Sequence, residues 1–147
     1  HPTARDLRSI TTAMKIATEL ERISDLSENI CERVLELADE PQLKPYIDIS
    51  HMADSSIHMV KGSLQAFLNE DSTLARQVCD NDDLVDNLIE QIFRELLSFM
   101  LEEPKSITRG IRVMFVAKYI ERIADHATNI AELVVYLVEG KIIRHTT

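Results

Sequence analysis

Residues 121–132 read ERIADHATNIAE, and residues 21–32 read ERISDLSENICE. Both fit the pattern Glu-Arg-Ile-x-Asp-x-x-x-Asn-Ile-x-Glu, and the same shift of 100 positions also aligns apolar residues on either side of it. Aligned apolar residues are expected of any two amphipathic helices, whereas aligned Glu, Asp and Asn are not, because a solvated helix face accepts almost any polar residue. The chain therefore carries one helical motif twice, and its shared polar residues are candidate functional residues.

Helical periodicity extends through most of the chain, and prolines and capping residues interrupt it. No stretch of useful length alternates as a strand would, and three glycines in 147 residues suit long helices with short connections. Thr3 is a candidate N-cap for the first helix, and Gly140 is a candidate C-cap for the last. The caps and breaks predict helices over residues 3–40, about 44–69, 71–103 and 106–140.

The spacing of the two motif copies predicts the arrangement of these helices. A repeat of 100 residues is the size of a small three-helix bundle. We therefore expect an all-α fold in which residues 41–147 form a complete three-helix bundle. Residues 1–40 would be the last long helix of a preceding bundle that is truncated at its N-terminus. Such a helix would expose a long apolar face, so we also expect a homodimer.

Charge limits the classes of partner. The chain has 16 basic and 25 acidic residues, a net charge of −9, which repels nucleic acid and suits a metal cation or a basic protein surface. No apolar run approaches the roughly 20 residues of a membrane span, and we expect no signal peptide. Cys31 and Cys79 have no metal-ligand spacing, so we expect both to be small buried side chains in a reducing compartment.

The repeated motif places oxygen donors along one helix face. Glu121, Asp125 and Asn129 are spaced i, i+4 and i+8, so they form a polar ridge. This ridge is roughly opposite the apolar seam of its helix, and we expect it to face outward or to line a shallow groove. Asp82 and Asp86 lie on the flank of the preceding helix, from which they can reach toward the ridge.

Carboxylates from two neighbouring helices would make a site suited to iron, manganese, magnesium or calcium. A cluster of solvated acids without a metal is the alternative interpretation. A ferritin-like di-iron enzyme is disfavoured because none of the five histidines follows a Glu by three positions. Since there is also no nucleophile–base pair, phosphate loop or cofactor fingerprint, we expect a protein that is not an enzyme.

The sequence resembles the PhoU family of bacterial phosphate-uptake regulators. The resemblance rests on the two Glu-Arg-Ile-x-Asp-x-x-x-Asn-Ile motifs and on Asp82-x-x-Val85-Asp86, and it covers essentially the whole chain. It implies two tandem three-helix bundles and a cytoplasmic, negative regulator of the phosphate-starvation response. It also implies contacts with the phosphate ABC transporter and the sensor histidine kinase, so that the membrane is reached only through these partners.

The resemblance also implies a metal site. Some family members bind multinuclear iron clusters or other metals through paired Glu/Asp-x-x-x-Asp motifs, and manganese, magnesium, calcium and zinc stay open here. Ser24 and Ala124 occupy a position that is often Gly in the family, and both are small enough to preserve close approach. The residues carried over are Asp82, Asp86, Glu121, Asp125 and Asn129 for an intact half-site, and Glu21, Asp25 and Asn29 for a half-site without its partner pair.

Two alternatives belong beside this interpretation. One is a PhoU-like domain of another phosphate-transport protein, with the same chemistry at a different location. The other is a metal-dependent enzyme of the helical-bundle type, which would need an inward-facing site that excludes water.

Overall fold

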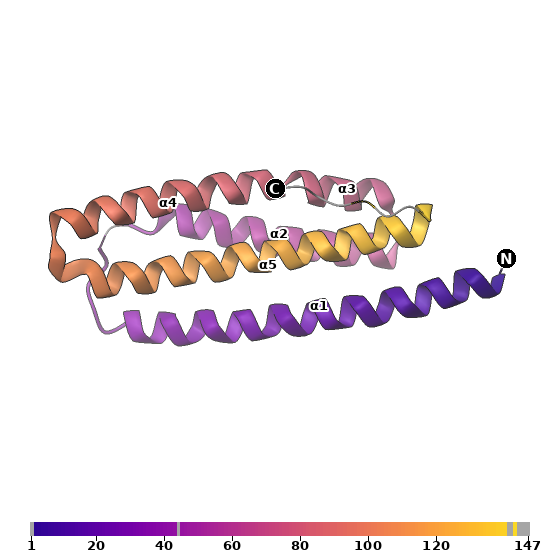
Figure 1. Cartoon of the computed structure of the whole chain (residues 1–147), viewed down its shortest axis with the longest axis horizontal. Coiled ribbons are helices and arrows are strands. Elements are labelled where there is room, and N and C mark those ends of the chain that lie inside the picture. The colour runs from indigo at the N-terminus through magenta and orange to yellow at the C-terminus, as the bar shows by residue number, and fades with distance from the viewer. Residues whose placement is uncertain (1, 44, 141–142, 144–147) are drawn as a thin grey trace.

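The computed structural model describes residues 2–43, 45–140 and 143, and every regular element in these ranges is helical (Figure 1). This confirms the predicted all-α fold. The elements are α1 (Pro2–Leu37), α2 (Ile47–Leu68), α3 (Ser72–Asp80), α4 (Asp82–Glu102), the 3-10 helix η1 (Pro104–Ser106) and α5 (Ile107–Glu139).

Helix α5 is the centre of the arrangement, because it contacts every other element. It packs antiparallel to α4 on one side and antiparallel to α1 on another, with α2 behind (Figure 1). Helices α2, α3–α4 and α5 thus run up, down and up as a bundle, and α1 lies along the outside of α5. The division of the chain at residue 40 into two repeats stays a prediction.

The core consists of aliphatic side chains and methionines at helical spacing. Burying each large apolar side chain contributes about 1.5–3 kcal/mol, so these residues supply most of the stabilisation. Ile16 of α1 belongs to the same buried cluster, which shows that α1 packs onto the bundle. Fully buried members of the bundle are Met52, Met59, Ile92, Leu96, Ile130 and Val134.

Two predicted boundaries need correction. The helix α1 begins at Pro2, so Thr3 lies within its first turn instead of capping it. The predicted helix over residues 71–103 is interrupted at Asn81 between α3 and α4. The sequence there is Asp-Asn-Asp-Asp, and these short polar side chains compete with the helical backbone for hydrogen bonds.

Other helix ends agree with the capping signals. Asp71 accepts a hydrogen bond from the backbone N–H of Leu74 at 3.0 Å and caps α3. Gly140 ends α5 in the left-handed conformation at φ 71°, as predicted. The helix α2 begins at Ile47, whereas the predicted start at Lys44 lies outside the described residues.

Ion pairs hold one end of α1 against α5, and the other end exposes an apolar face. Near its C-terminal end, Arg112 of α5 forms ion pairs with Glu36 at 3.3 Å and with Glu40 at 3.2 Å. Leu7, Ile10 and Met14 at the other end are exposed, which agrees with the expected apolar face. Homodimerisation stays a prediction. No described helix is long and apolar enough to cross a membrane.

Candidate metal site

Three aspartates from two helices converge between α4 and α5. Asp82 and Asp86 stand one turn apart at the start of α4, and Asp125 comes from the middle of α5. Residues four apart share a helix face, and the antiparallel packing brings that face against Asp125. One carboxylate oxygen from each lies within 4.8 Å of the others. The structure thus brings together three of the five residues predicted for the intact half-site.

These carboxylates are not on an outward ridge. Asp82 is only 1% exposed, and Asp86 and Asp125 are half-buried. Of the two placements predicted for the ridge, facing outward or lining a shallow groove, the outward one is therefore wrong for the second motif copy. The physical reason is that α5 is surrounded by other helices, so a stripe opposite its main seam still meets α4 on one side and α1 on the other.

The electrostatics of Asp125 reflect this crowding. Burial raises the pKa of the Asp125 carboxyl above its ordinary value, and the neighbouring charges of Glu121 and Asp86 raise it further. The positive charges of Lys118 and His126 act in the opposite direction. Since the net effect disfavours the ionised carboxylate, a cation at this position would relieve the repulsion.

Glu121 and Asn129, the other predicted ligands of this half-site, are engaged elsewhere. Lys118 donates from Nζ to Oε1 of Glu121 at 2.5 Å. Asn129 donates from Nδ2 to Oε2 of Glu19 at 3.3 Å, which ties it to α1. Among the described residues, the carboxylate cluster therefore contains only the three aspartates.

The first motif copy has no such surroundings. Glu21 and Asp25 are exposed on α1, and Asn29 is half-buried. The part of the chain that the structure describes forms no second cluster of three or more His, Cys, Asp or Glu. The structure therefore does not bring Glu21, Asp25 and Asn29 together with partner carboxylates, and their role as ligands stays a prediction.

Glu19 is a residue beside the site that the repeat did not reveal. Its Oε2 lies 2.5 Å from Nδ1 of His126, which follows Asp125 directly, and both side chains are largely buried. His126 thus lies in the interface between α1 and α5. Comparison of the two motif copies could not identify this pair, because the counterparts of Glu19 and His126 are Tyr119 and Leu26, which have different side-chain chemistry.

The donor set determines which cations fit. Carboxylate oxygens are the preferred ligands of magnesium, calcium, manganese and iron. Zinc sites usually include His or Cys, and none belongs to this cluster. Three aspartates fit a hard cation whose remaining ligands are water or neighbouring oxygens, and they fit zinc poorly.

The fold and the site together define a class: helical-bundle proteins with a carboxylate site on the seam between two antiparallel helices. Within that class the sequence identifies the family. The sequence profile described as the PhoU domain matches residues 1–34 and 49–134, so the chain belongs to the PhoU family.

Similar proteins agree with this assignment. The chain is 47% identical over 144 residues to the "Phosphate-specific transport system accessory protein PhoU homolog" of Aquifex aeolicus, covering 98% of the chain and 65% of that protein. It is 39% identical over 145 residues to the protein of the same name from Pseudomonas putida, covering 98% of the chain and 57% of that protein. The chain thus spans about three fifths of the length of these curated relatives.

Solved structures show the same fold. The crystal structure of PhoU from Pseudomonas aeruginosa superposes with a TM-score of 0.91 at 37% identity, over 96% of this chain and 68% of that one. The phosphate transport system regulatory protein PhoU from Streptococcus pneumoniae gives 0.87 at 26% identity, over 95% and 66%. The names describe accessory and regulatory proteins, which confirms at the level of the family that the chain is not an enzyme.

Proposed function

We propose that this chain belongs to a negative regulator of the phosphate-starvation response that links the phosphate ABC transporter to the sensor histidine kinase. Membership of the PhoU family is the observation that carries the proposal, since the relatives are named as accessory proteins of a phosphate-specific transport system. The net charge of −9 suits contacts with basic protein surfaces. The regulator works in the cytoplasm as a homodimer and meets the membrane only through its partners.

The proposal includes a metal. Asp82, Asp86 and Asp125 would hold a hard cation, iron first, either as one ion or within a multinuclear cluster that Glu121 and Asn129 help to surround. A bound cation supplies positive charge that offsets the repulsion between the carboxylates. Because the aspartates come from α4 and α5, it would also clamp these two helices and fix the surface that they present to a partner.

Elemental analysis of the purified chain, followed by iron and manganese titration, tests the metal. Wild type is compared with Asp86→Ala/Asp125→Ala and with Asp25→Ala, the exposed counterpart of Asp125 in the first copy. We expect the double variant to lose bound metal and Asp25→Ala to retain it. Unchanged metal content in the double variant would refute the site.

Capture of the partners tests the adaptor role. The whole protein, tagged and purified, is incubated with the transporter ATPase and with the cytoplasmic part of the kinase in separate experiments. We expect stable complexes with both. Failure to capture either one at micromolar concentrations would refute the adaptor role while leaving the metal site untouched.

A further inference from the structure

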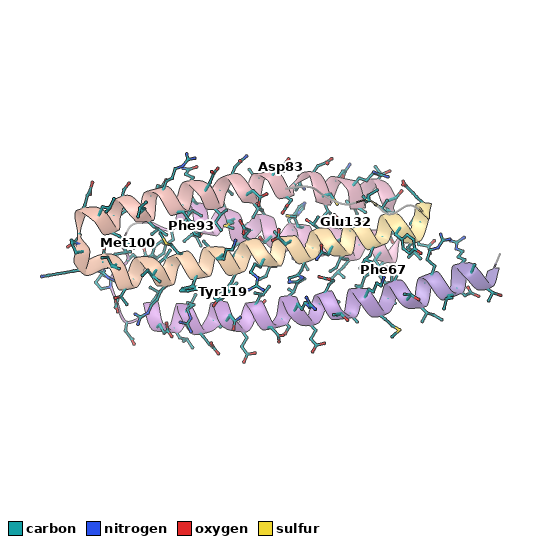
Figure 2. The ribbon with its side chains drawn as sticks, viewed as in Figure 1. Phe67, Asp83, Phe93, Met100, Tyr119 and Glu132 are labelled. Carbon is teal, nitrogen blue, oxygen red and sulfur yellow. The ribbon has the colours of Figure 1, made fainter. Side chains whose placement is uncertain are left out.

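Apolar side chains gather on the outer surface where α4 ends and α5 begins. We define the α4–α5 patch as Phe93, Leu97, Leu101, Ile107, Ile111 and Phe115. The last five are between 42% and 75% exposed. Phe93 points from α4 toward α5, where it lines a groove of about 250 Å³ together with Ile111, Met114, Phe115 and Lys118 (Figure 2).

The spacing makes this patch continuous along both helices. Phe93, Leu97 and Leu101 are spaced i, i+4 and i+8 on α4, and Ile107, Ile111 and Phe115 have the same spacing on α5. The two stripes lie side by side because the helices form an antiparallel pair joined by η1. Contiguous exposed apolar surface of this kind commonly marks an interaction site.

The internal repeat shows that two of these side chains, Ile111 and Phe115, are not shared by the two copies of the motif helix. The counterparts of Ile111 and Phe115 in the first copy are Thr11 and Lys15, both exposed on α1. The exposed Ile10 of α1, by contrast, corresponds to Gly110, which α5 buries against Met100. Ile107 keeps an apolar and exposed counterpart, Leu7, so Ile111 and Phe115 are the patch residues of α5 that are apolar in the second copy alone.

The charges around the patch indicate its partner. Helix α4 has six acidic residues and one basic residue, Arg94, which lies 3.5 Å from Glu90 in an ion pair. Lys118, at the edge of the groove, is paired with Glu121. These two cations are thus already matched, and even with Lys105 of η1 the excess charge beside the patch is negative. The acidic residues within or next to the patch are Glu90, Glu95 and Glu102 of α4 and Glu103, which follows it, whereas Asp82, Asp83 and Asp86 lie at the other end of the helix.

We propose that the α4–α5 patch binds an amphipathic helix of a partner protein that carries Lys or Arg beside its apolar stripe. An amphipathic helix in an apolar groove is a recurrent mode of recognition, and flanking charges set its specificity. A symmetric dimer through the same patch would place one acidic α4 against another, which like-charge repulsion disfavours. The inference rests on the adaptor role proposed above, to which it adds the surface and the chemistry of the partner.

A pair of designed peptides tests the inference on the whole chain. Each is a helix of about five turns with the same leucine stripe, and the polar positions are Lys in one and Glu in the other. Binding is followed by fluorescence anisotropy and by NMR shifts of the labelled chain. We expect the Lys peptide to bind at least about tenfold more tightly than the Glu peptide, with shifts confined to residues 93–118.

Matched variants assign the binding to the patch. Ile111→Thr/Phe115→Thr should weaken the Lys peptide by about tenfold or more, whereas Leu84→Thr should change its affinity less than about twofold. Leu84 is 54% exposed on α4 but lines a separate groove with Asp54 and His58, and all three substitutions leave the net charge unchanged. Circular dichroism confirms that each variant folds.

Several outcomes would overturn the inference. If the double variant and Leu84→Thr bind the Lys peptide with equal affinity, the patch is not the binding surface. If sedimentation shows a dimer that only the double variant loses, the patch serves self-association instead. If the chain binds vesicles with anionic lipids and the double variant does not, the patch serves a membrane instead. If the whole protein captures the transporter ATPase or the kinase equally well with and without the patch, the inference fails while the adaptor role stands. If the wild-type protein captures neither the transporter ATPase nor the kinase, the adaptor role itself is refuted.

Discussion

Nδ1 of His126 lies 2.5 Å from Oε2 of Glu19, and the same oxygen accepts a hydrogen bond from Nδ2 of Asn129 at 3.3 Å. One carboxylate of α1 thereby holds two side chains of α5 that flank the candidate metal site. Both Glu19 and His126 are less than one fifth exposed. Such largely buried contacts contribute more to stability than the exposed ion pairs elsewhere on α1.

Removal of the Glu19 carboxylate should loosen α1 from α5. In Glu19→Ala the polar atoms of His126 and Asn129 lose their shared acceptor, and we expect the free energy of unfolding to fall by about 1–3 kcal/mol. The melting temperature should fall by about 2–4 °C for each kcal/mol in a chain of this size. Urea unfolding and calorimetry measure both quantities.

Glu21→Ala is the control for this prediction. Glu21 is exposed on the same helix two residues away, so its removal should change stability by less than about 0.5 kcal/mol. If the two substitutions lower the free energy of unfolding equally, the Glu19 carboxylate does not hold α1 against α5.

The raised pKa of Asp125 predicts the direction of a pH effect in the presence of a chelator. A carboxyl whose folded-state pKa is raised binds more protons in the folded than in the unfolded state over the interval above 3.8. The stability of the protein therefore decreases as pH rises through this interval, and the full cost of ionising Asp125 is present at neutral pH. The substitution Asp125→Asn removes this cost.

We therefore expect Asp125→Asn to be more stable than wild type at neutral pH in chelator, and the difference to shrink as pH falls toward the unfolded-state value of 3.8. Urea unfolding across the pH range measures the difference between the two proteins. Asp25→Asn, at the exposed counterpart, should show no such trend. A wild type that is more stable than Asp125→Asn at neutral pH without metal would contradict the prediction.

The sequence predicted the elements that depend on local signals and repetition. The motif at residues 21–32 and 121–132 predicted that α1 and α5 are equivalent helices, and Gly140 predicted the end of α5. The shared polar residues also pointed to Asp125, and with it to the Asp82/Asp86 pair, before any packing was known. These inferences needed only helical geometry and the comparison of one half of the chain with the other.

Some inferences that depend on neighbouring helices failed. Facing outward was one of two placements expected for the ridge through Asp125, because a single helix has one apolar seam, but α4 and α1 both pack beside it. Cys31 was expected to be buried and is exposed, since it lines an open groove that α1 forms with α2 and α5. Glu19 escaped notice because it lies outside the repeated motif, and only the packing of α1 on α5 gives it partners.

Gly140 supplies a test of the C-cap. Its φ of 71° is disfavoured for residues with a side chain, and its backbone N–H donates to the carbonyl of Tyr136 at 2.9 Å. Gly140→Ala should lower the free energy of unfolding by about 1–2 kcal/mol. Gly140→Asn should cost less, because Asn adopts this conformation more readily. A thermal melt that ranks Asn below Ala would show that space near Arg8, and not backbone strain, limits the position.

The two cysteines should differ sharply in reactivity. Cys31 is exposed, whereas Cys79 is buried, and burial together with the nearby charges of Glu132 and Asp80 raises the pKa of its thiol to about 11. Because the thiolate is the reacting species, a disulfide reagent near pH 8 should label Cys31 quickly and label Cys79 only when the protein opens.

Single substitutions identify which thiol gives which phase. Cys31→Ser should abolish the fast phase of labelling, and Cys79→Ser should leave it intact while removing the slow one. Addition of urea to the transition region should accelerate the slow phase in Cys31→Ser, because labelling of a buried thiol follows the population of opened molecules. Rapid labelling of Cys79 in the folded protein would mean that α3 and α5 separate far more often than their buried contact implies.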